Sequence, residues 1–147
     1  MASSPAREGR PPIHLLASEA DQVAGLALRV EHDHPVVASM LLEEIERAEL
    51  HDPQSMPADA VRLDSRVAFV DERTSELREV QLVLPLAANI AEGRISILTP
   101  MGAALYGLVS GQSIDWPDRQ GNTRPIRIVR VVQPRDEEDE DPGPLAA

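Results

Sequence analysis

The sequence predicts an α+β protein in which a short antiparallel helical hairpin precedes a twisted antiparallel β half-barrel with one packed helix. Apolar residues repeat at helical spacing before residue 50 and alternate with a period of two after residue 60. A chain of 147 residues suits one domain, or one small domain with an appendage. We therefore expect a disordered N-terminus (1–12), the hairpin (13–52), a linker (53–60), the half-barrel (61–134) and a disordered acidic tail (135–147).

The hairpin is expected to consist of two amphipathic helices joined by a turn of about four residues, which makes them antiparallel neighbours. Ser18 and Asp21 match a capping box for the first helix, and Pro35 suits the first position of the second. The apolar faces are Ala20, Val23, Ala24, Ala27 and Val30, then Val37, Leu41, Ile45 and Ala48. Arms of about 12 and 16 residues span only roughly 18 and 24 Å.

The half-barrel is expected to contain four or five strongly twisted strands. A proline-punctuated connector at residues 52–60 precedes them. The predicted strands are residues 61–69, 79–84, 95–98, 113–116 and 125–132. Gly121-Asn122 predicts a hairpin turn before the last strand, and arginines at a spacing of three within that strand predict a bulge or strong twist.

One short helix is expected to pack on this sheet. Thr99 suits its N-cap and Pro100 its first turn, and Gly111 ends the helical pattern. An apolar stripe about two turns long is formed by Met101, Ala104, Leu105 and Leu108. A capped helix between two strand-like segments is expected to cover the sheet as a lid.

Charge and composition exclude several classes of function. The net charge is −11, with eight acids against two arginines in residues 19–50 and six consecutive acids in residues 136–141. This distribution disfavours autonomous binding to nucleic acid, which needs clustered positive charge. The absence of cysteine excludes disulfides and thiolate metal sites. Without a membrane-length apolar run or a secretory signal, the protein is expected in the cytoplasm.

The sequence offers no recognisable catalytic motif. Gly-x-Ser-x-Gly, P-loop and dinucleotide-binding patterns are absent. All four histidines, His14, His32, His34 and His51, precede the half-barrel, where surface or capping roles are favoured over catalysis. We therefore expect a protein that is not an enzyme, with no catalytic residue, no cofactor and no resident metal.

One known family shares two stretches of this sequence. They are Ile-Leu-Thr-Pro-Met-Gly-Ala-Ala-Leu-Tyr-Gly-Leu (97–108) and Gly-Gln-Ser-Ile-Asp-Trp (111–116), which resemble the C-terminal domain of the GreA/GreB transcript-cleavage factors. The narrower regulator of nucleoside diphosphate kinase (Rnk) family is also matched by Ala48-Glu49, Ser55-Met56-Pro57, Asp64-Ser65-Arg66-Val67 and residues 131–134. The resemblance spans about residues 12–134. It implies a short helical hairpin, an FKBP-like barrel and binding to bacterial RNA polymerase.

The resemblance assigns a role to the turn Thr99-Pro100-Met101-Gly102. In the cleavage factors, the corresponding Ser-Pro turn contacts the coiled coil at the rim of the polymerase secondary channel. The same four residues are also explained as a helix cap followed by a packing glycine. The two accounts are compatible, and both stay open at this point.

The tip of the hairpin, Glu31-His32-Asp33-His34, has two interpretations. In the cleavage factors, a much longer coiled coil carries an acidic tip to the polymerase active site and helps hold a catalytic metal. Carboxylates and imidazoles are suitable metal ligands, but exposed helix turns are built from the same residue types. The favoured interpretation is a solvated turn on an arm too short to reach that metal, and a functional acidic tip is the alternative.

These observations lead to two hypotheses about function. The first is a non-enzymatic transcription regulator that docks near the secondary channel and competes with the cleavage factors without stimulating transcript cleavage. The alternative is a protein-interaction module that regulates nucleoside diphosphate kinase expression or activity independently of polymerase. In the first hypothesis the chain is a monomer that meets DNA or RNA only through polymerase.

Overall fold

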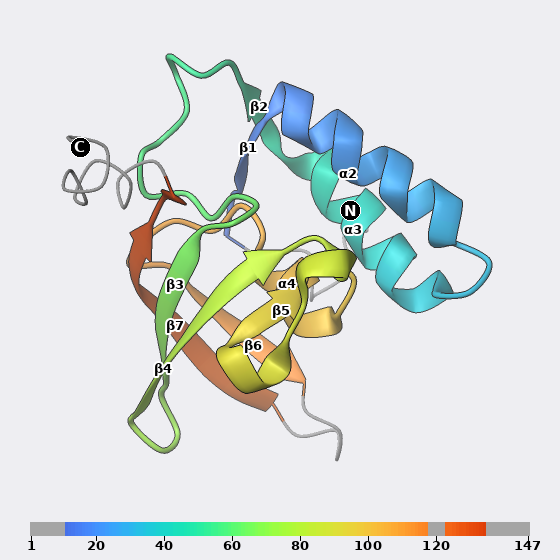
Figure 1. Cartoon of the computed structure of the whole chain (residues 1–147). Coiled ribbons are helices and arrows are strands. Elements are labelled where there is room, and N and C mark those ends of the chain that lie inside the picture. The colour runs from blue at the N-terminus through green and yellow to red at the C-terminus, as the bar shows by residue number, and fades with distance from the viewer. Residues whose placement is uncertain (1–10, 118–122, 135–147) are drawn as a thin grey trace, which may run out of the picture.

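The computed structural model describes residues 11–117 and 123–134 and has the α+β architecture that the sequence predicts (Figure 1). Its elements are β1 (His14–Leu16), α2 (Ala17–Val30), α3 (Pro35–Arg47), β2 (Glu49–His51), β3 (Arg66–Asp71), β4 (Glu76–Val83), η1 (Pro85–Ala87), η2 (Ile90–Glu92), β5 (Arg94–Ser96), α4 (Pro100–Leu105), β6 (Ser113–Pro117) and β7 (Thr123–Val132). The predicted turn at Gly121-Asn122, residues 1–10 of the predicted disordered N-terminus and the predicted disordered tail lie outside the described residues. Pro11 and Pro12 are described, and their carbonyls accept hydrogen bonds from Arg47 and Gln112. The division of the chain into separate domains remains a prediction.

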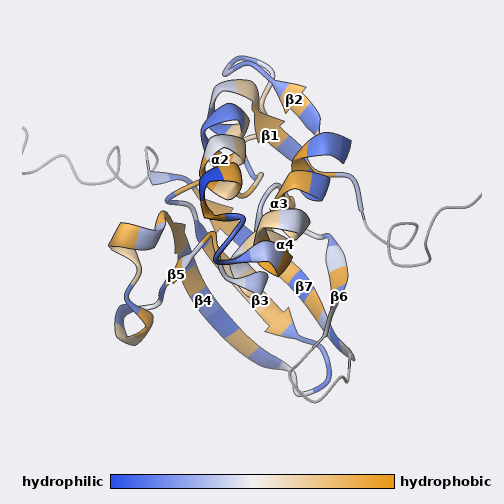
Figure 2. Cartoon of the chain, turned by 90° about the vertical axis from the view of Figure 1, so that its right-hand side faces the viewer, coloured by the Kyte–Doolittle hydropathy of each residue, from blue (hydrophilic) through white to orange (hydrophobic). Residues whose placement is uncertain are grey.

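The main sheet has five strands in the order β5-β4-β3-β7-β6. Neighbours are antiparallel except β4 and β5, which are parallel with Leu82 opposite Ile95, so the expectation of a wholly antiparallel sheet is wrong. The reason lies in the connection, because the segment with η1 and η2 returns the chain to the level of Gln81, so that β5 runs beside the last residues of β4 in the same direction. Hydrophobic and hydrophilic residues alternate along β4 (Figure 2).

The bulge predicted for the last strand is present. Ala68 of β3 lies opposite Arg130 of β7, whereas the next residue, Phe69, lies opposite Ile128. Val129 is therefore the extra residue, and 44% of its surface is exposed. A bulge of this kind lets Ile128 stay buried while the strand twists.

Three predicted boundaries are wrong. The strand expected from residue 61 begins at Arg66, because Asp64 has a φ of 72° and turns the chain. The helix expected to reach residue 108 ends at Leu105, and Gly107 follows with a φ of 86°. The capping box at Ser18 is absent, since α2 starts directly from β1 with Leu16 as its N-cap and no side-chain cap.

A two-stranded ladder closes the base of the helix pair. β1, which precedes α2, pairs in parallel with β2, which follows α3, and His14 lies opposite Glu49. Residues 13–16 suit either a short strand or an entry segment by their sequence, but nothing in residues 49–51 indicates β2. The ladder holds the two ends of the helix pair side by side.

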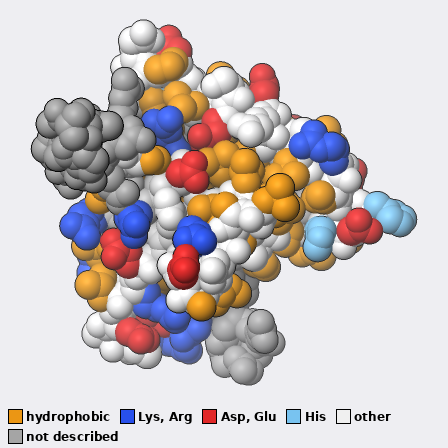
Figure 3. All heavy atoms as spheres, in the orientation of Figure 1, with side chains coloured by type: hydrophobic (Ala, Val, Ile, Leu, Met, Phe, Trp, Pro, Cys, Tyr) orange, Lys and Arg blue, Asp and Glu red, His pale blue; other side chains and the backbone are white. Residues whose placement is uncertain are grey.

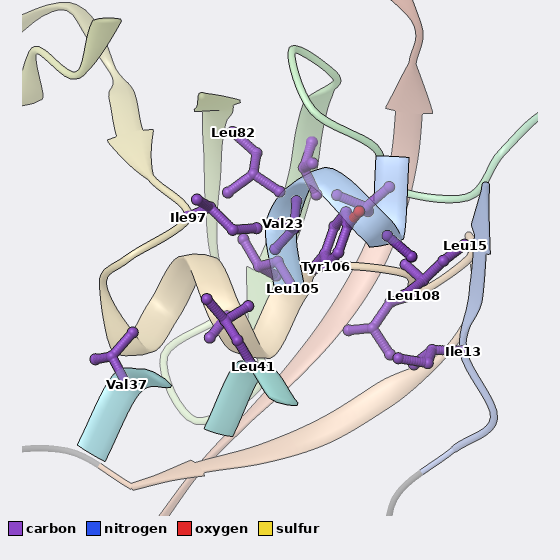
Figure 4. Close-up of a cluster of buried hydrophobic side chains, with 14 of the residues drawn as sticks. Ile13, Leu15, Val23, Val37, Leu41, Leu82, Ile97, Leu105, Tyr106 and Leu108 are labelled. Carbon is purple, nitrogen blue, oxygen red and sulfur yellow. The ribbon is translucent and has the colours of Figure 1, made fainter. Parts of the chain in front are cut away.

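The helix pair, α4 and the sheet share one hydrophobic core (Figure 4). Within it, α3 contacts α4, and α4 contacts β5. The largest fully buried side chains are Tyr106, Ile13, Leu15, Leu41, Leu82, Ile97, Leu105, Leu108, Ile128, Val23, Val61 and Val67. The helix pair is therefore packed on the body of the protein along its apolar face.

Candidate functional site

The start of α4 is held by the N-cap that the sequence predicts at Thr99. Its hydroxyl oxygen accepts a hydrogen bond from the N–H of Gly102 at 3.0 Å and donates one to the carbonyl of Ser96 at 2.7 Å. The carbonyl of Thr99 accepts from the N–H of Ala103 at 2.9 Å. The first turn of the helix is therefore satisfied within the chain.

Of the four residues assigned to docking, Thr99 caps the helix and Gly102 packs against β5. Gly102 is buried, and a Cβ built on it would lie 2.2 Å from the carbonyl oxygen of Ser96, so no larger residue fits. Pro100 is exposed, and Met101 is half-buried against the core. A partner at this turn would meet Pro100 and part of Met101, and the docking role of all four residues remains a prediction.

An apolar groove lies beside this turn. It has a volume of about 620 Å³ and runs between the end of α2 and the segment around η1. Its lining includes Leu26, Val30, His34, Leu84, Leu86 and Leu98. Because Leu98 precedes the cap of α4 and His34 belongs to the tip, the groove connects the two regions that the sequence singles out.

The segment along one side of the groove exposes two large apolar side chains. The side chain of Leu86 in η1 is fully exposed, and Ile90 in the neighbouring η2 is 84% exposed. Large apolar side chains that gather beside a groove mark a candidate contact surface. The groove was not predicted from the sequence, although two large aliphatic residues in a predicted loop, Leu86 and Ile90, were the available signal.

The tip of the helix pair faces solvent. Glu31, His32, Asp33 and His34 are all exposed (Figure 3). Within residues 11–117 and 123–134, the group of three potential metal ligands that comes together is His14, Glu49 and His51, at the opposite end of the helix pair. The tip therefore has the geometry of a solvated turn, and its functional role remains a prediction.

The reach of the helix pair is short. At 1.5 Å per residue, the 14 residues of α2 and the 13 residues of α3 span about 21 and 20 Å. Residues along both helices are buried in the shared core, namely Ala20, Val23 and Ala27 in α2, and Val37, Ala38 and Leu41 in α3. The pair lies against the body, and its free end alone extends past it (Figure 1).

One carboxylate fastens α2 to the half-barrel. Oε1 of Glu19 accepts hydrogen bonds from the N–H of Leu63 and the hydroxyl of Tyr106, both at 3.1 Å. Burial raises the pKa of Glu19 above its ordinary value of 4.5, although these two hydrogen bonds and the nearby Arg62 oppose the rise. Burial, and then the charge of Glu19, raise the pKa of Tyr106. This contact fixes the helix pair and was not foreseen from the sequence.

The fold and the α4 turn place the chain in a known class. Residues 56–133 match the family model described as "Transcription elongation factor, GreA/GreB, C-term". A solved structure, "Prokaryotic transcription elongation factor GreA/GreB from Nitrosomonas europaea", superposes with a TM-score of 0.68 at 33% identity. The match covers 84% of this chain and 99% of that one.

Individual relatives define a narrower family. The chain is 34% identical over 122 residues to the regulator of nucleoside diphosphate kinase of Escherichia coli K12, covering 83% of this chain and 90% of that protein. It is also 34% identical over 133 residues to the transcription elongation factor GreA of Mesorhizobium japonicum, covering 85% and 84% of the two chains. The chain therefore belongs to the regulator of nucleoside diphosphate kinase (Rnk) family, within the GreA/GreB superfamily.

Family membership gives the class of function. The relatives carry names of regulators and of transcription elongation factors. In the part of the chain that the structure describes, none of the helices has the length and apolar character that crossing a membrane requires. The chain is a transcription-factor-like regulator.

Proposed function

We propose that this chain is a non-enzymatic regulator that binds bacterial RNA polymerase near the secondary channel. It competes there with the Gre cleavage factors and does not stimulate transcript cleavage. It acts in the cytoplasm as a monomer and meets DNA or RNA only through the polymerase. Its half-barrel is of the FKBP-like kind.

The observation that carries this proposal is the short, packed helix pair. A span of about 21 Å that is buried along one face cannot act as a free rod. The tip can block an entrance beside the body of the protein, but it cannot carry Glu31 and Asp33 deep into a channel. Binding without stimulated cleavage follows from that limit.

The surface chemistry supports a protein partner. The segment 19–50 carries eight acids against two arginines, and phosphate binding requires the opposite charge. The apolar groove between α2 and η1 joins the tip to the start of α4. An apolar groove flanked by exposed apolar side chains is a surface that a protein element can fill. We place the docking surface on Pro100, Met101 and this groove.

The test is competition for purified core RNA polymerase. Increasing amounts of the chain should displace a labelled GreA cleavage factor and should reduce the RNA trimming that this factor produces in stalled elongation complexes. The chain alone should leave the nascent RNA at full length. Trimming caused by the chain itself, or binding that the cleavage factor cannot displace, would overturn the proposal.

Surface variants locate the docking face. Pro100→Glu and Leu86→Glu should each weaken polymerase binding, on the order of tenfold, if these apolar side chains are central to the contact. Leu77→Glu is the matched control, since Leu77 is an exposed apolar residue near the β3–β4 turn. All three variants should melt as the parent chain does. Equal weakening by the control would move the docking surface elsewhere.

A second candidate function comes from the name of the relative. The Escherichia coli protein is a regulator of nucleoside diphosphate kinase. In this alternative, the groove binds a partner in that pathway independently of polymerase. If the chain changes the rate of purified nucleoside diphosphate kinase in the absence of polymerase, this second function is favoured. If the kinase rate is unchanged and the chain binds polymerase, the first function is favoured.

A further inference from the structure

Two histidines and a glutamate gather at the base of the helix pair. His14 lies on β1, and Glu49 and His51 lie on β2, which runs parallel to it. His51 and His14 are separated by 37 positions in the sequence, yet Nδ1 of His14 is 3.0 Å from Nε2 of His51. The ladder between β1 and β2 creates this cluster, because it aligns the entry and exit of the helix pair.

We propose that His14, Glu49 and His51 form a zinc-binding site. Nδ1 of His14 lies 3.6 Å from Oε1 of Glu49, and Nε2 of His51 lies 3.9 Å from Oε2 of the same residue. A tetrahedral zinc ion with bonds of about 2.0–2.1 Å holds its ligands about 3.3 Å apart. These two distances involve different oxygens of Glu49. One ligand atom from each residue lies within 4.8 Å of the other two, so a small shift of the exposed Glu49 side chain brings the three atoms to the spacing that one ion requires.

A neighbouring serine orients one of the ligands. Nδ1 of His51 is 3.2 Å from the hydroxyl of Ser55, whose own N–H donates to a carboxylate oxygen of Asp52 at 3.0 Å. With the Ser55 hydroxyl as acceptor, the proton of His51 lies on Nδ1 and the lone pair of Nε2 faces His14. A second hydrogen bond of this kind is the usual support of a zinc-binding histidine.

The exposure of the three side chains suits an ion at the edge of the protein. The side chains of His14 and His51 are 21% and 10% exposed, and that of Glu49 is 66% exposed. Three protein ligands leave the fourth position of a tetrahedral ion for water. Two imidazoles favour zinc over calcium or magnesium, which prefer oxygen ligands.

The position of the site defines its role. β1 leads into α2, and β2 leaves α3, so an ion bound to both strands joins the two ends of the helix pair. The N–H of His14 also donates to the carbonyl of Gly107 at 3.0 Å, which links the same strand to the half-barrel. Zinc would thus clamp the helix pair onto the body, and it would do so far from the tip.

The test uses the full chain without a histidine tag, after treatment with EDTA. Calorimetric titration with zinc chloride should give one ion per chain, and a hundredfold excess over the dissociation constant should raise Tm by about 5–10 °C. The double variant His14→Gln/His51→Gln should lose both effects. His32→Gln/His34→Gln is the matched control, since it removes the two tip histidines, and it should retain them.

Ser55→Ala gives a second measurement that leaves all three ligands in place. It should reduce zinc affinity by about tenfold or more, as removal of an outer hydrogen bond does at other sites. All variants must unfold cooperatively in EDTA. Absence of 1:1 binding by the parent chain, undiminished binding by the His14→Gln/His51→Gln variant, or loss of binding in the tip control would overturn the proposal.

Discussion

The contact between Glu19 and the half-barrel gives the sharpest test of how the helix pair is held. The variants are Glu19→Ala, which removes the acceptor, and Glu19→Gln, which keeps a side-chain oxygen for the N–H of Leu63 and the hydroxyl of Tyr106. Because both variants remove the charge, the difference between them isolates the two hydrogen bonds. The parent chain then shows what the charge adds.

The magnitude follows from the number of donors that lose their acceptor. Tyr106 is fully buried, and an unsatisfied buried donor costs about 1–3 kcal/mol. Glu19 is half-buried, so water reaches part of this site, and we take the lower end of that range for each donor. Glu19→Ala should therefore unfold about 2 kcal/mol more easily than Glu19→Gln, which corresponds to a Tm lower by about 4–8 °C.

The pH dependence tests the charge separately. Because the pKa of Glu19 is raised in the folded state, the folded chain binds a proton more readily than the unfolded chain above pH 4.5. The stability that Glu19 contributes is fully present below the unfolded-state pKa and is lost as pH rises through the folded-state pKa. Glu19→Gln should thus be at least as stable as the parent chain at pH 7. As the pH falls, the free energy of unfolding of the parent chain should rise relative to that of Glu19→Gln.

Urea unfolding of the three chains between pH 4.5 and pH 7.5 provides the measurement, and subtraction removes the titration of all other groups. Equal stability of Glu19→Ala and Glu19→Gln would refute the role of the two hydrogen bonds. A parent chain that loses stability relative to Glu19→Gln as pH falls would refute the raised pKa.

Two further predictions concern the start of α4. Gly102→Ala should destabilise the chain by about 3 kcal/mol, because its Cβ meets the carbonyl of Ser96, whereas Gly25→Ala in the middle of α2 should stabilise it by up to about 1 kcal/mol. Equal effects in thermal melts would contradict the close approach of α4 to β5. Thr99→Ala should cost about 1 kcal/mol and Thr99→Ser much less, and a Thr99→Ala variant as stable as the parent chain would contradict the cap.

The features predicted correctly from the sequence are those encoded by neighbouring residues. The Thr99-Pro100 cap and the start of α3 at Pro35 follow from the backbone preferences of a short segment, and the bulge opposite Ala68 follows from the spacing of arginines within one strand. The change from helical to alternating spacing likewise predicts the α+β class. Such signals do not depend on which segment, distant in the sequence, packs beside them in the folded structure.

The features that were missed depend on distant contacts. β2 is a strand only because β1 lies beside it, and the pairing of residues 14–16 with 49–51 has no local signature. In the sequence, Glu19 has the features of a solvated helix residue, because its partners Leu63 and Tyr106 are far away along the chain. The groove exists because η1 folds over the end of α2. The histidine cluster has the same origin, since its members are far apart in sequence.

The same distant contacts determine whether the helix pair can project from the body. Swinging it outward would expose Val23, Val37 and Leu41, and burial of each such side chain contributes about 1.5–3 kcal/mol. The sum, roughly 5–9 kcal/mol, is comparable to the whole stability of a typical domain, about 5–15 kcal/mol. An extended form is therefore too rare to bind effectively, because a partner would have to supply this energy. In the proposed function, the packed form is therefore the one that docks, and its reach is that of the tip alone.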